Sequence, residues 1–219
     1  MNNKEKAQKI IGILNNQFEK WSAPVQELEK VRGKDPFKIL LSTIISLRTK
    51  DEVTIEASKR LFKILSKPKD INKIKTNDIE KAIYPAGFYK NKSKQIEKIS
   101  YTLLTQHDST VPDNRDELIK FEGIGRKTAN LILAEGYNQD TICVDTHVHR
   151  ISNRIGFIKT HTPYETEIEL EKILHTKLYK IYNKLLVGLG QTICKPISPK
   201  CSMCPIENLC QKEQVINHR

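Results

Sequence analysis

The sequence lacks the features that mark membrane-spanning, secreted and β-rich proteins. No apolar run approaches the ~20 residues that a membrane span needs, and the N-terminal MNNKEKAQKIIGIL has neither a signal-peptide core nor a cleavage-site pattern. Alternating apolar and polar runs are absent, as are Asn-Gly and Asp-Gly hairpin turns. These absences predict an all-α, cytoplasmic protein with no membrane partner.

Linkers and negative charge are also scarce. No Pro-, Ser- or Gly-rich stretch divides the 219 residues, a length that suits one large domain or two small ones. Lys and Arg number 37 against 26 Asp and Glu, so the net charge is +11. This imbalance favours nucleic acid as the partner. A merely lysine-rich composition is the other interpretation.

Helix signals, by contrast, recur along the whole chain. Asp35 followed by Pro36 gives an N-cap and a first-turn proline before the apolar run FKILLSTIISL. The spacing of apolar residues predicts about ten helices joined by short loops. The other predicted helix starts are Asp51, Thr76, Asp113 or Asn114, and Thr162, and the helix after Asn114 is expected to reach Phe121.

Cysteine is nearly absent before the C-terminus. Four of the five cysteines lie in CKPISPKCSMCPIENLC, with the spacing C-x6-C-x2-C-x5-C: Cys194, Cys201, Cys204 and Cys210. Clustered cysteines in an intracellular chain indicate a metal site before disulfides. The single C-x2-C favours an iron–sulfur cluster over zinc, with zinc and two disulfides left open. The fifth, Cys143, stands among apolar residues and is expected to be buried and inert.

The segment between the first two clustered cysteines, KPISPK, carries Lys195 and Lys200. Metal ligation at both ends and two prolines would hold this loop stiffly. A stiff loop can present lysines to a phosphate backbone, so both are candidate DNA contacts. The alternative is that they are ordinary solvated lysines.

Two glycines interrupt good helical sequence in FEGIGRKTANLIL. Gly123 and Gly125 flank Ile124, which can pack inward while backbone N–H groups face outward to bind a phosphate. In a basic chain this pattern predicts a helix-hairpin-helix DNA-binding element over about residues 113–135, rather than a plain helical corner. Lys127 lies at the second helix start, where the macrodipole disfavours a cation. Taken alone it is either a surface lysine or a nucleophile.

Asp145 follows 18 residues after Lys127 and can cap the helical run that begins in VDTHVHR. The combination of LIKFEGIGRKTAN, VDTHVHR and the cysteine spacing resembles the endonuclease III family of DNA glycosylases, over nearly the whole chain. The resemblance implies a six-helix barrel with the helix-hairpin-helix at 29–136, and an iron–sulfur domain formed by 1–28 with 137–219.

The same resemblance implies the site. Lys127 is the expected nucleophile and Asp145 the expected essential carboxylate, facing each other across the cleft between the two domains. The four clustered cysteines are the expected ligands of a 4Fe–4S cluster. The expected partner is duplex DNA with a damaged base or an abasic site, bound by a monomer associated with the nucleoid.

The implied activity is a bifunctional base-excision-repair DNA N-glycosylase and abasic-site lyase, working by β-elimination through a lysine Schiff base. Adenine glycosylases lack a lysine at the position of Lys127 and are longer, and 8-oxoguanine glycosylases usually lack the cysteines. Oxidised pyrimidines are therefore the expected substrates. Mismatched uracil or thymine, or an oxidised purine, are the alternative lesions. A non-catalytic helix-hairpin-helix DNA-binding protein with a structural cluster is the alternative class.

The chain departs from the family pattern in one place. Bacterial members typically have a glutamine that fills the gap left by the flipped base, where this chain has Arg48 in LRTKD. A longer, charged side chain can donate to the orphaned base or to a phosphate, so the opposite-base preference is open. Phe88, in AGFYKNK, matches the position of an apolar wedge between bases. A core phenylalanine is the other interpretation.

Overall fold

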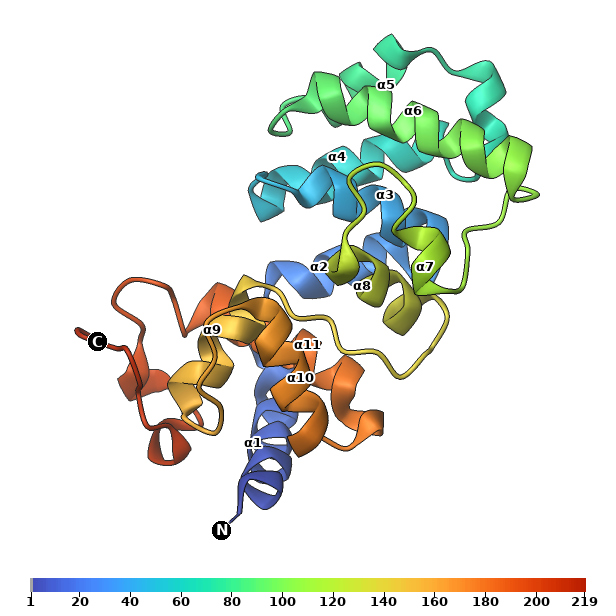
Figure 1. Cartoon of the computed structure of the whole chain (residues 1–219). Coiled ribbons are helices and arrows are strands. Elements are labelled where there is room, and N and C mark those ends of the chain that lie inside the picture. Colours follow the sequence, from blue (N-terminus) through green and yellow to red (C-terminus); the bar gives the residue numbers. More distant parts are fainter. Residues whose placement is uncertain (1) are drawn as a thin grey trace. The chain divides into compact units, whose positions relative to one another are not determined.

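The computed structural model describes residues 2–219, and within this range the chain is helical with no strand (Figure 1). The all-α prediction is confirmed. None of the helices in this range combines the length and apolarity that crossing a membrane requires. The α-helices are α1 (Asn3–Phe18), α2 (Pro24–Arg32), α3 (Pro36–Ser46), α4 (Asp51–Ile64), α5 (Thr76–Ile83), α6 (Tyr89–Gln106), α7 (Arg115–Leu118), α8 (Arg126–Gly136), α9 (Thr146–Ile155), α10 (Pro163–Ile173) and α11 (Tyr179–Thr192). Short 3-10 helices are η1 (Glu19–Trp21), η2 (Pro68–Lys73), η3 (Thr176–Leu178), η4 (Cys201–Met203) and η5 (Glu207–Leu209).

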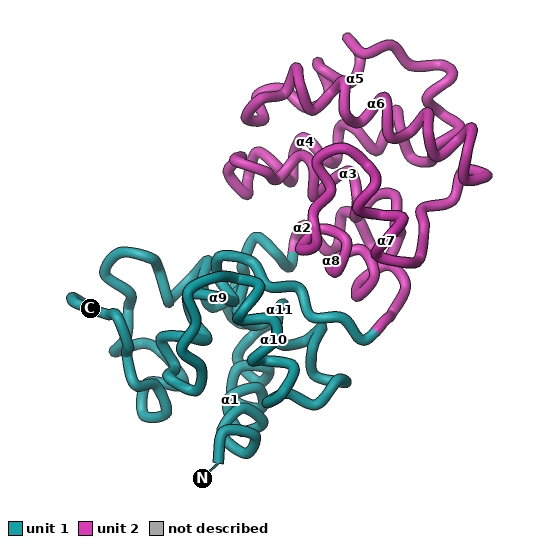
Figure 2. The backbone as a smooth tube through the Cα atoms, viewed as in Figure 1, with its two compact units in different colours: residues 1–26, 140–219 teal, residues 27–139 magenta. Residues whose placement is uncertain are grey.

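The chain forms two compact units (Figure 2). The first unit combines residues 1–26 with 140–219, and the second unit comprises residues 27–139. The expected domain limits lie within three residues of these limits. The hairpin with Lys127 belongs to the second unit, whereas Asp145 and the four clustered cysteines belong to the first.

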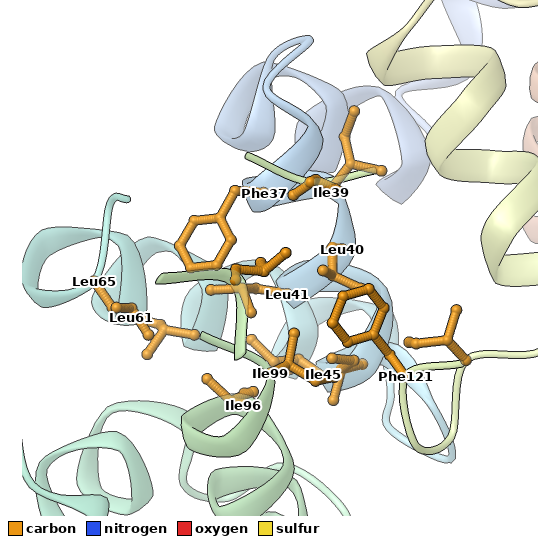
Figure 3. Packing of buried hydrophobic residues seen from close by; sticks show 14 of the residues in the cluster. Phe37, Ile39, Leu40, Leu41, Ile45, Leu61, Leu65, Ile96, Ile99 and Phe121 are labelled. Carbon is orange, nitrogen blue, oxygen red and sulfur yellow. The ribbon is translucent and has the colours of Figure 1, made fainter. Parts of the chain in front are cut away.

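The core of the second unit is organised around α3. Its residues Ile39, Leu40, Leu41 and Ile45 are all fully buried (Figure 3). A helix that is apolar all round needs neighbours on every side, and α3 packs against α4, α6 and α8. Burial of each such side chain contributes about 1.5–3 kcal/mol. The same core thereby fixes α6 and α8, which carry the surface features described below.

The core of the first unit packs α1 and α9 against α11. Ile10 and Leu14 of α1 and Ile151 of α9 are almost completely buried, and α11 packs against both helices. The buried Tyr182 of α11 lies 2.8 Å, hydroxyl to hydroxyl, from Ser152 of α9. This polar contact between two apolar faces sets the register of α9, whose N-terminus carries Asp145.

Side-chain caps begin α3, α7 and α10, as predicted. The Asp35 carboxylate accepts from the backbone N of Phe37 (2.9 Å) and of Lys38 (3.3 Å). Asn114 likewise caps α7 and Thr162 caps α10. Such a cap stabilises a helix by about 1 kcal/mol, which explains why these starts are legible in the sequence.

The predicted starts at Asp51 and Thr76 are wrong by one residue. Asp51 is the first residue of α4, and its N-cap is Lys50 without a side-chain bond. A carboxylate inside the first turn still meets the positive end of the helix dipole. Thr76 is likewise the first residue of α5, and its hydroxyl donates to the Glu97 carboxylate at 2.7 Å. Asp51 thus favours α4 without capping it, and Thr76 links α5 to α6.

Candidate nucleic-acid interface and cysteine site

The hairpin between α7 and α8 is a turn held by one buried side chain. Ile124 is 4% exposed, and its backbone N donates to the Phe121 carbonyl at 3.0 Å. The expected helix up to Phe121 is wrong, because α7 ends at Leu118. Phe121 instead donates to the Leu118 carbonyl in a turn-type bond of 3.3 Å. The inward position expected for Ile124 is confirmed.

The two glycines of the hairpin are there for different reasons. Gly123 has a φ of +76°, and a Cβ on it would lie 2.5 Å from Nε2 of Gln95. Gln95, on α6, donates to the Glu122 carbonyl at 2.6 Å. Gly125 has an ordinary φ of −96°, and a Cβ there would meet nothing within 4 Å. The fold itself requires glycine at 123, whereas nothing in the chain requires it at 125.

The N-terminus of α8 carries no side-chain cap. The N-cap residue is Gly125, which has no side chain that could accept a hydrogen bond from the first amides of α8. Gly125 and Lys127, the second residue of α8, are both exposed. Because no cap side chain offsets the partial positive charge at the N-terminus of α8, this end of the helix favours binding of an anion such as a phosphate.

The N-terminus of α9, in contrast, is capped by Asp145. Its Oδ1 accepts from the backbone N of His147 at 2.9 Å and of Val148 at 2.8 Å. Both capping bonds are made to Oδ1, so Oδ2 takes no part in the cap. The capping role expected for Asp145 is confirmed, and the cap leaves one carboxylate oxygen available to a ligand.

Arg48 and Phe88 lie together, although the sequence suggested them separately. The Arg48 guanidinium carbon lies 5.6 Å from the centroid of the Phe88 ring, a cation–π distance. Phe88 is 61% exposed, so a core role is excluded. Both residues have positive φ, 52° for Arg48 and 57° for Phe88. A charged group and an aromatic ring thus project from two strained turns as one surface unit.

Sequence reasoning missed the residue that ties these two turns together. Lys92 of α6 is 5% exposed, and its ammonium donates to the Ile45 carbonyl at 2.7 Å and to Thr49 Oγ1 at 2.8 Å. A signal was present, because Lys92 precedes the buried Ile96 by four residues and so continues the buried face of α6. The signal is hard to recognise because Lys92 stands between two other lysines in KNKSK, which reads as a solvated polar stretch.

The four clustered cysteines line one cavity of the first unit. All four are free, and the apolar side chains of Ile151 and Leu189 complete the wall. Burial raises the pKa of the Cys204 thiol to about 12, and burial also raises the pKa of Cys201 and Cys210. Without a metal these groups are therefore thiols, and a bound metal would have to displace their protons.

Hydrogen-bond donors already point at two of the sulfurs. Arg154 Nη1 lies 3.4 Å from Cys194 Sγ, and the backbone N of Lys212 lies 3.4 Å from Cys210 Sγ. Donors of this kind stabilise thiolate ligands of a metal centre. The expected buried state of Cys143 is confirmed at 3% exposure.

The KPISPK loop is held from α9. Arg154 donates from Nη1 to the Lys195 carbonyl and from Nη2 to the Pro196 carbonyl, both at 2.7 Å. The Lys195 ammonium turns back to the Gln191 carbonyl at the end of α11. Lys200 lies beside the cysteine cavity. Both lysines are half-buried, so neither is a fully solvated lysine.

Comparison with known proteins adds four findings. A family model described as HhH-GPD superfamily base excision DNA repair protein matches residues 41–176. An endonuclease III of Thermotoga maritima is 45% identical over 177 residues, which cover 81% of this chain and 83% of that protein. A chloroplastic endonuclease III homolog of Arabidopsis thaliana is 40% identical over 80% of this chain, which spans about half (48%) of that protein. Among solved structures, a trapped endonuclease III–DNA covalent intermediate matches with a TM-score of 0.82 at 30% identity, over 97% of both chains.

Proposed function

This chain belongs to the endonuclease III family of the HhH-GPD superfamily and is a base-excision-repair DNA glycosylase and lyase; we propose that Lys127 and Asp145 carry its chemistry. The single observation behind the assignment is the contrast between two helix starts. The α8 start presents the exposed Lys127 two residues after Gly125, an N-cap without a side-chain bond, and the α9 start presents a carboxylate with one oxygen outside the cap.

Lys127 is the nucleophile in this proposal. A glycosylase reaches the anomeric carbon by extruding the target nucleotide from the duplex. The Lys127 amine attacks C1′ as the damaged base leaves, and the sugar opens to a Schiff base with Nζ. Loss of a C2′ proton then expels the 3′-phosphate, which nicks the strand. The exposure of Lys127 at the start of α8 suits access to an extruded sugar.

Asp145 is the carboxylate partner in the same reaction. The two α9 amides fix Oδ1, so that Oδ2 can stabilise the positive charge that develops on the sugar and can accept a proton from the attacking amine. The charge and geometry of Asp145 are thus set by the helix that it caps. Removing the charge while keeping the cap is the informative change.

The hairpin is the proposed phosphate contact. Gly123, Ile124 and Gly125 place the start of α8 at the surface, and a Cβ-free position at 125 lets a backbone approach closely. Arg48 and Phe88 are the proposed contacts at the gap left by the extruded base. Lys195 and Lys200 are proposed contacts from the KPISPK loop, weaker ones because both are half-buried.

A 4Fe–4S cluster is the proposed occupant of the cysteine cavity. Among residues 2–219, no group of three or more His, Cys, Asp or Glu is placed to hold a single metal ion. The four cysteines line one cavity, and their spacing, with a single C-x2-C, favours an iron–sulfur cluster over one tetrahedral zinc. When bound, the cluster would supply iron–thiolate bonds that cross-link the end of α11 to the C-terminal segment. Brown protein absorbing near ~400 nm is expected, and colourless zinc-loaded protein would contradict it.

Oxidised pyrimidines, such as thymine glycol, are the proposed substrates in duplex DNA, and the protein is proposed to act as a monomer. The alternatives are mismatched uracil or thymine and oxidised purines. A panel of duplexes that carries each lesion opposite each base measures the preference directly. Faster base release from a uracil or thymine mismatch than from thymine glycol would replace the pyrimidine assignment.

The deciding experiment is borohydride trapping of a covalent protein–DNA adduct on abasic duplex. Lys127→Ala should abolish the adduct. Lys127→Arg should abolish it too while retaining DNA binding, because a guanidinium keeps the charge but stays protonated. Lys172→Ala, at an exposed lysine of α10 paired with Glu169, is the control and should trap like the parent. An undiminished adduct in Lys127→Ala would exclude Lys127 as the nucleophile.

A further inference from the structure

Lys92 is a buried lysine that takes no part in the proposed reaction of Lys127 and Asp145. Its ammonium has three N–H donors, and all three are engaged: they reach the carbonyl oxygens of Ile45 and Leu47 and the hydroxyl of Thr49. Burial lowers the pKa of Lys92 to about 8, so the ammonium form, with its three donors, predominates at pH 7.

The three acceptors lie on both sides of Arg48. Ile45 belongs to the last turn of α3, Leu47 follows that helix, and Thr49 leads into α4. Arg48 itself has a φ of 52°, in the left-handed region that residues with a side chain rarely adopt. Such a conformation persists only where its neighbours over-determine it. Lys92 supplies that constraint from outside the turn.

Gly87 joins the turn to the start of α6. Its backbone N donates to Thr49 Oγ1 at 3.0 Å, and a Cβ on it would lie 2.3 Å from the Arg48 carbonyl oxygen. Only glycine permits so close an approach. The next residue, Phe88, therefore emerges beside Arg48, and its carbonyl accepts from the backbone N of Lys92 at 3.0 Å.

We propose that Lys92 is a positioning residue for lesion recognition, which holds Arg48 and Phe88 as one preformed unit that enters the duplex beside the extruded nucleotide. The side chain of Lys92 fixes the Arg48 turn, and its backbone fixes Phe88. The inference rests on the proposed function of that pair. Ordering the pair before binding removes an entropic penalty that would otherwise fall at the moment of insertion.

The first test compares Lys92→Met with Lys94→Met. Lys94 is exposed on the same helix, so its replacement removes the same charge without touching the Arg48 turn. The probe is a duplex with a tetrahydrofuran abasic analogue opposite 2-aminopurine, whose fluorescence reports the stacking of the orphaned base. At saturating protein, the fluorescence change with Lys92→Met should fall below about half of the parent's, because the pair is no longer preformed. Lys94→Met should match the parent.

The second test separates positioning from general support of the fold. If Lys92 acts through Arg48, then Lys92→Met has no further effect on the fluorescence once Arg48→Ala is present. Independent effects that add in the double variant would overturn the inference.

Thr49→Val keeps Lys92 but removes the bridging hydroxyl, and it should lower the fluorescence change part of the way. This variant decides the question if Lys92→Met fails to fold by circular dichroism, and a parent-like change would then overturn the inference.

Failure of the inference and failure of the proposed function give different results. Borohydride trapping through Lys127 on a natural abasic duplex tests the chemistry without the fluorescent probe. A parent protein that traps DNA but leaves the probe fluorescence unchanged refutes the insertion of Arg48 and Phe88, and the inference with it. A folded Lys92→Met that keeps the full fluorescence change refutes the role of Lys92 alone.

Discussion

The helices α8 and α9 begin in opposite ways. Asp145 caps α9 with its own carboxylate, whereas α8 starts on Gly125 without any side-chain cap. The first arrangement satisfies the helix end internally and fixes a carboxylate in place. The second leaves the helix end to an external anion. In the proposed function, the same backbone feature orients the catalytic carboxylate in one unit and binds a phosphate in the other.

Among the substitutions that test this comparison, Asp145→Asn should have the largest effect. Asparagine caps a helix about as well as aspartate does, so the free energy of unfolding should change by less than ~1 kcal/mol. Base release should nevertheless fall by roughly 100-fold or more, because the carboxylate charge that is proposed to face the sugar is gone. Single-turnover base release and urea unfolding measure the two quantities. Parent-like turnover would mean that Asp145 is only a cap.

Gly123→Ala should show that the first glycine serves the fold. Alanine at a φ of +76° is strained, and its Cβ would displace Gln95 from the Glu122 carbonyl. Strain and the lost hydrogen bond together should lower the free energy of unfolding by about 2 kcal/mol. Urea unfolding followed by circular dichroism measures the loss. Unchanged stability would show that the turn relaxes without penalty.

Gly125→Ser should turn the start of α8 into one that resembles the start of α9. Serine is a good N-cap, and its Cβ has room, so stability should rise by a few tenths of a kcal/mol, roughly the N-cap difference between the two residues. Duplex binding should weaken by about 1 kcal/mol, because the new hydroxyl occupies amides that the phosphate needs.

The matched control for Gly125→Ser is Gly12→Ser on α1. A Cβ at Gly12 also meets nothing within 4 Å, so this variant adds the same side chain far along the sequence from the hairpin. Fluorescence anisotropy with an abasic duplex should show parent-like affinity for Gly12→Ser. Equal affinity for Gly125→Ser and the parent would remove the hairpin from the phosphate contact.

The sequence predicts those parts of the fold that depend on neighbouring residues. Caps at Asp35 and Thr162 are legible because the capping oxygen and its amide partners lie within three residues. Thr76 is misplaced because its hydroxyl bonds to Glu97, 21 residues away. A local pattern carries no information about such a partner. The end of α7 was misplaced because the apolar face continues past Leu118 into the turn.

The candidate site also has features that short stretches of sequence predict and features that depend on residues far apart in the sequence. The glycine pattern, the aspartate and the cysteine spacing are each contained in a short stretch of sequence. The pairing of Arg48 with Phe88 joins residues 40 positions apart, and the contacts of Lys92 and Gly87 hold the two turns that carry it. The family resemblance supplied both residues individually. The buried polar contacts that hold them together could come only from the structure.

Helix α6 also fixes the spacing between two turns of the second unit. Through Lys92 it holds the Arg48 turn, and through Gln95, three residues on, it holds the hairpin turn at Glu122. Positions three apart lie on one face of a helix, and each residue rotates the face by about 100°. One inserted residue between them would therefore detach one of the two turns. Point substitutions should be tolerated along the outer face of α6, whereas any change in the length of this short segment should not be.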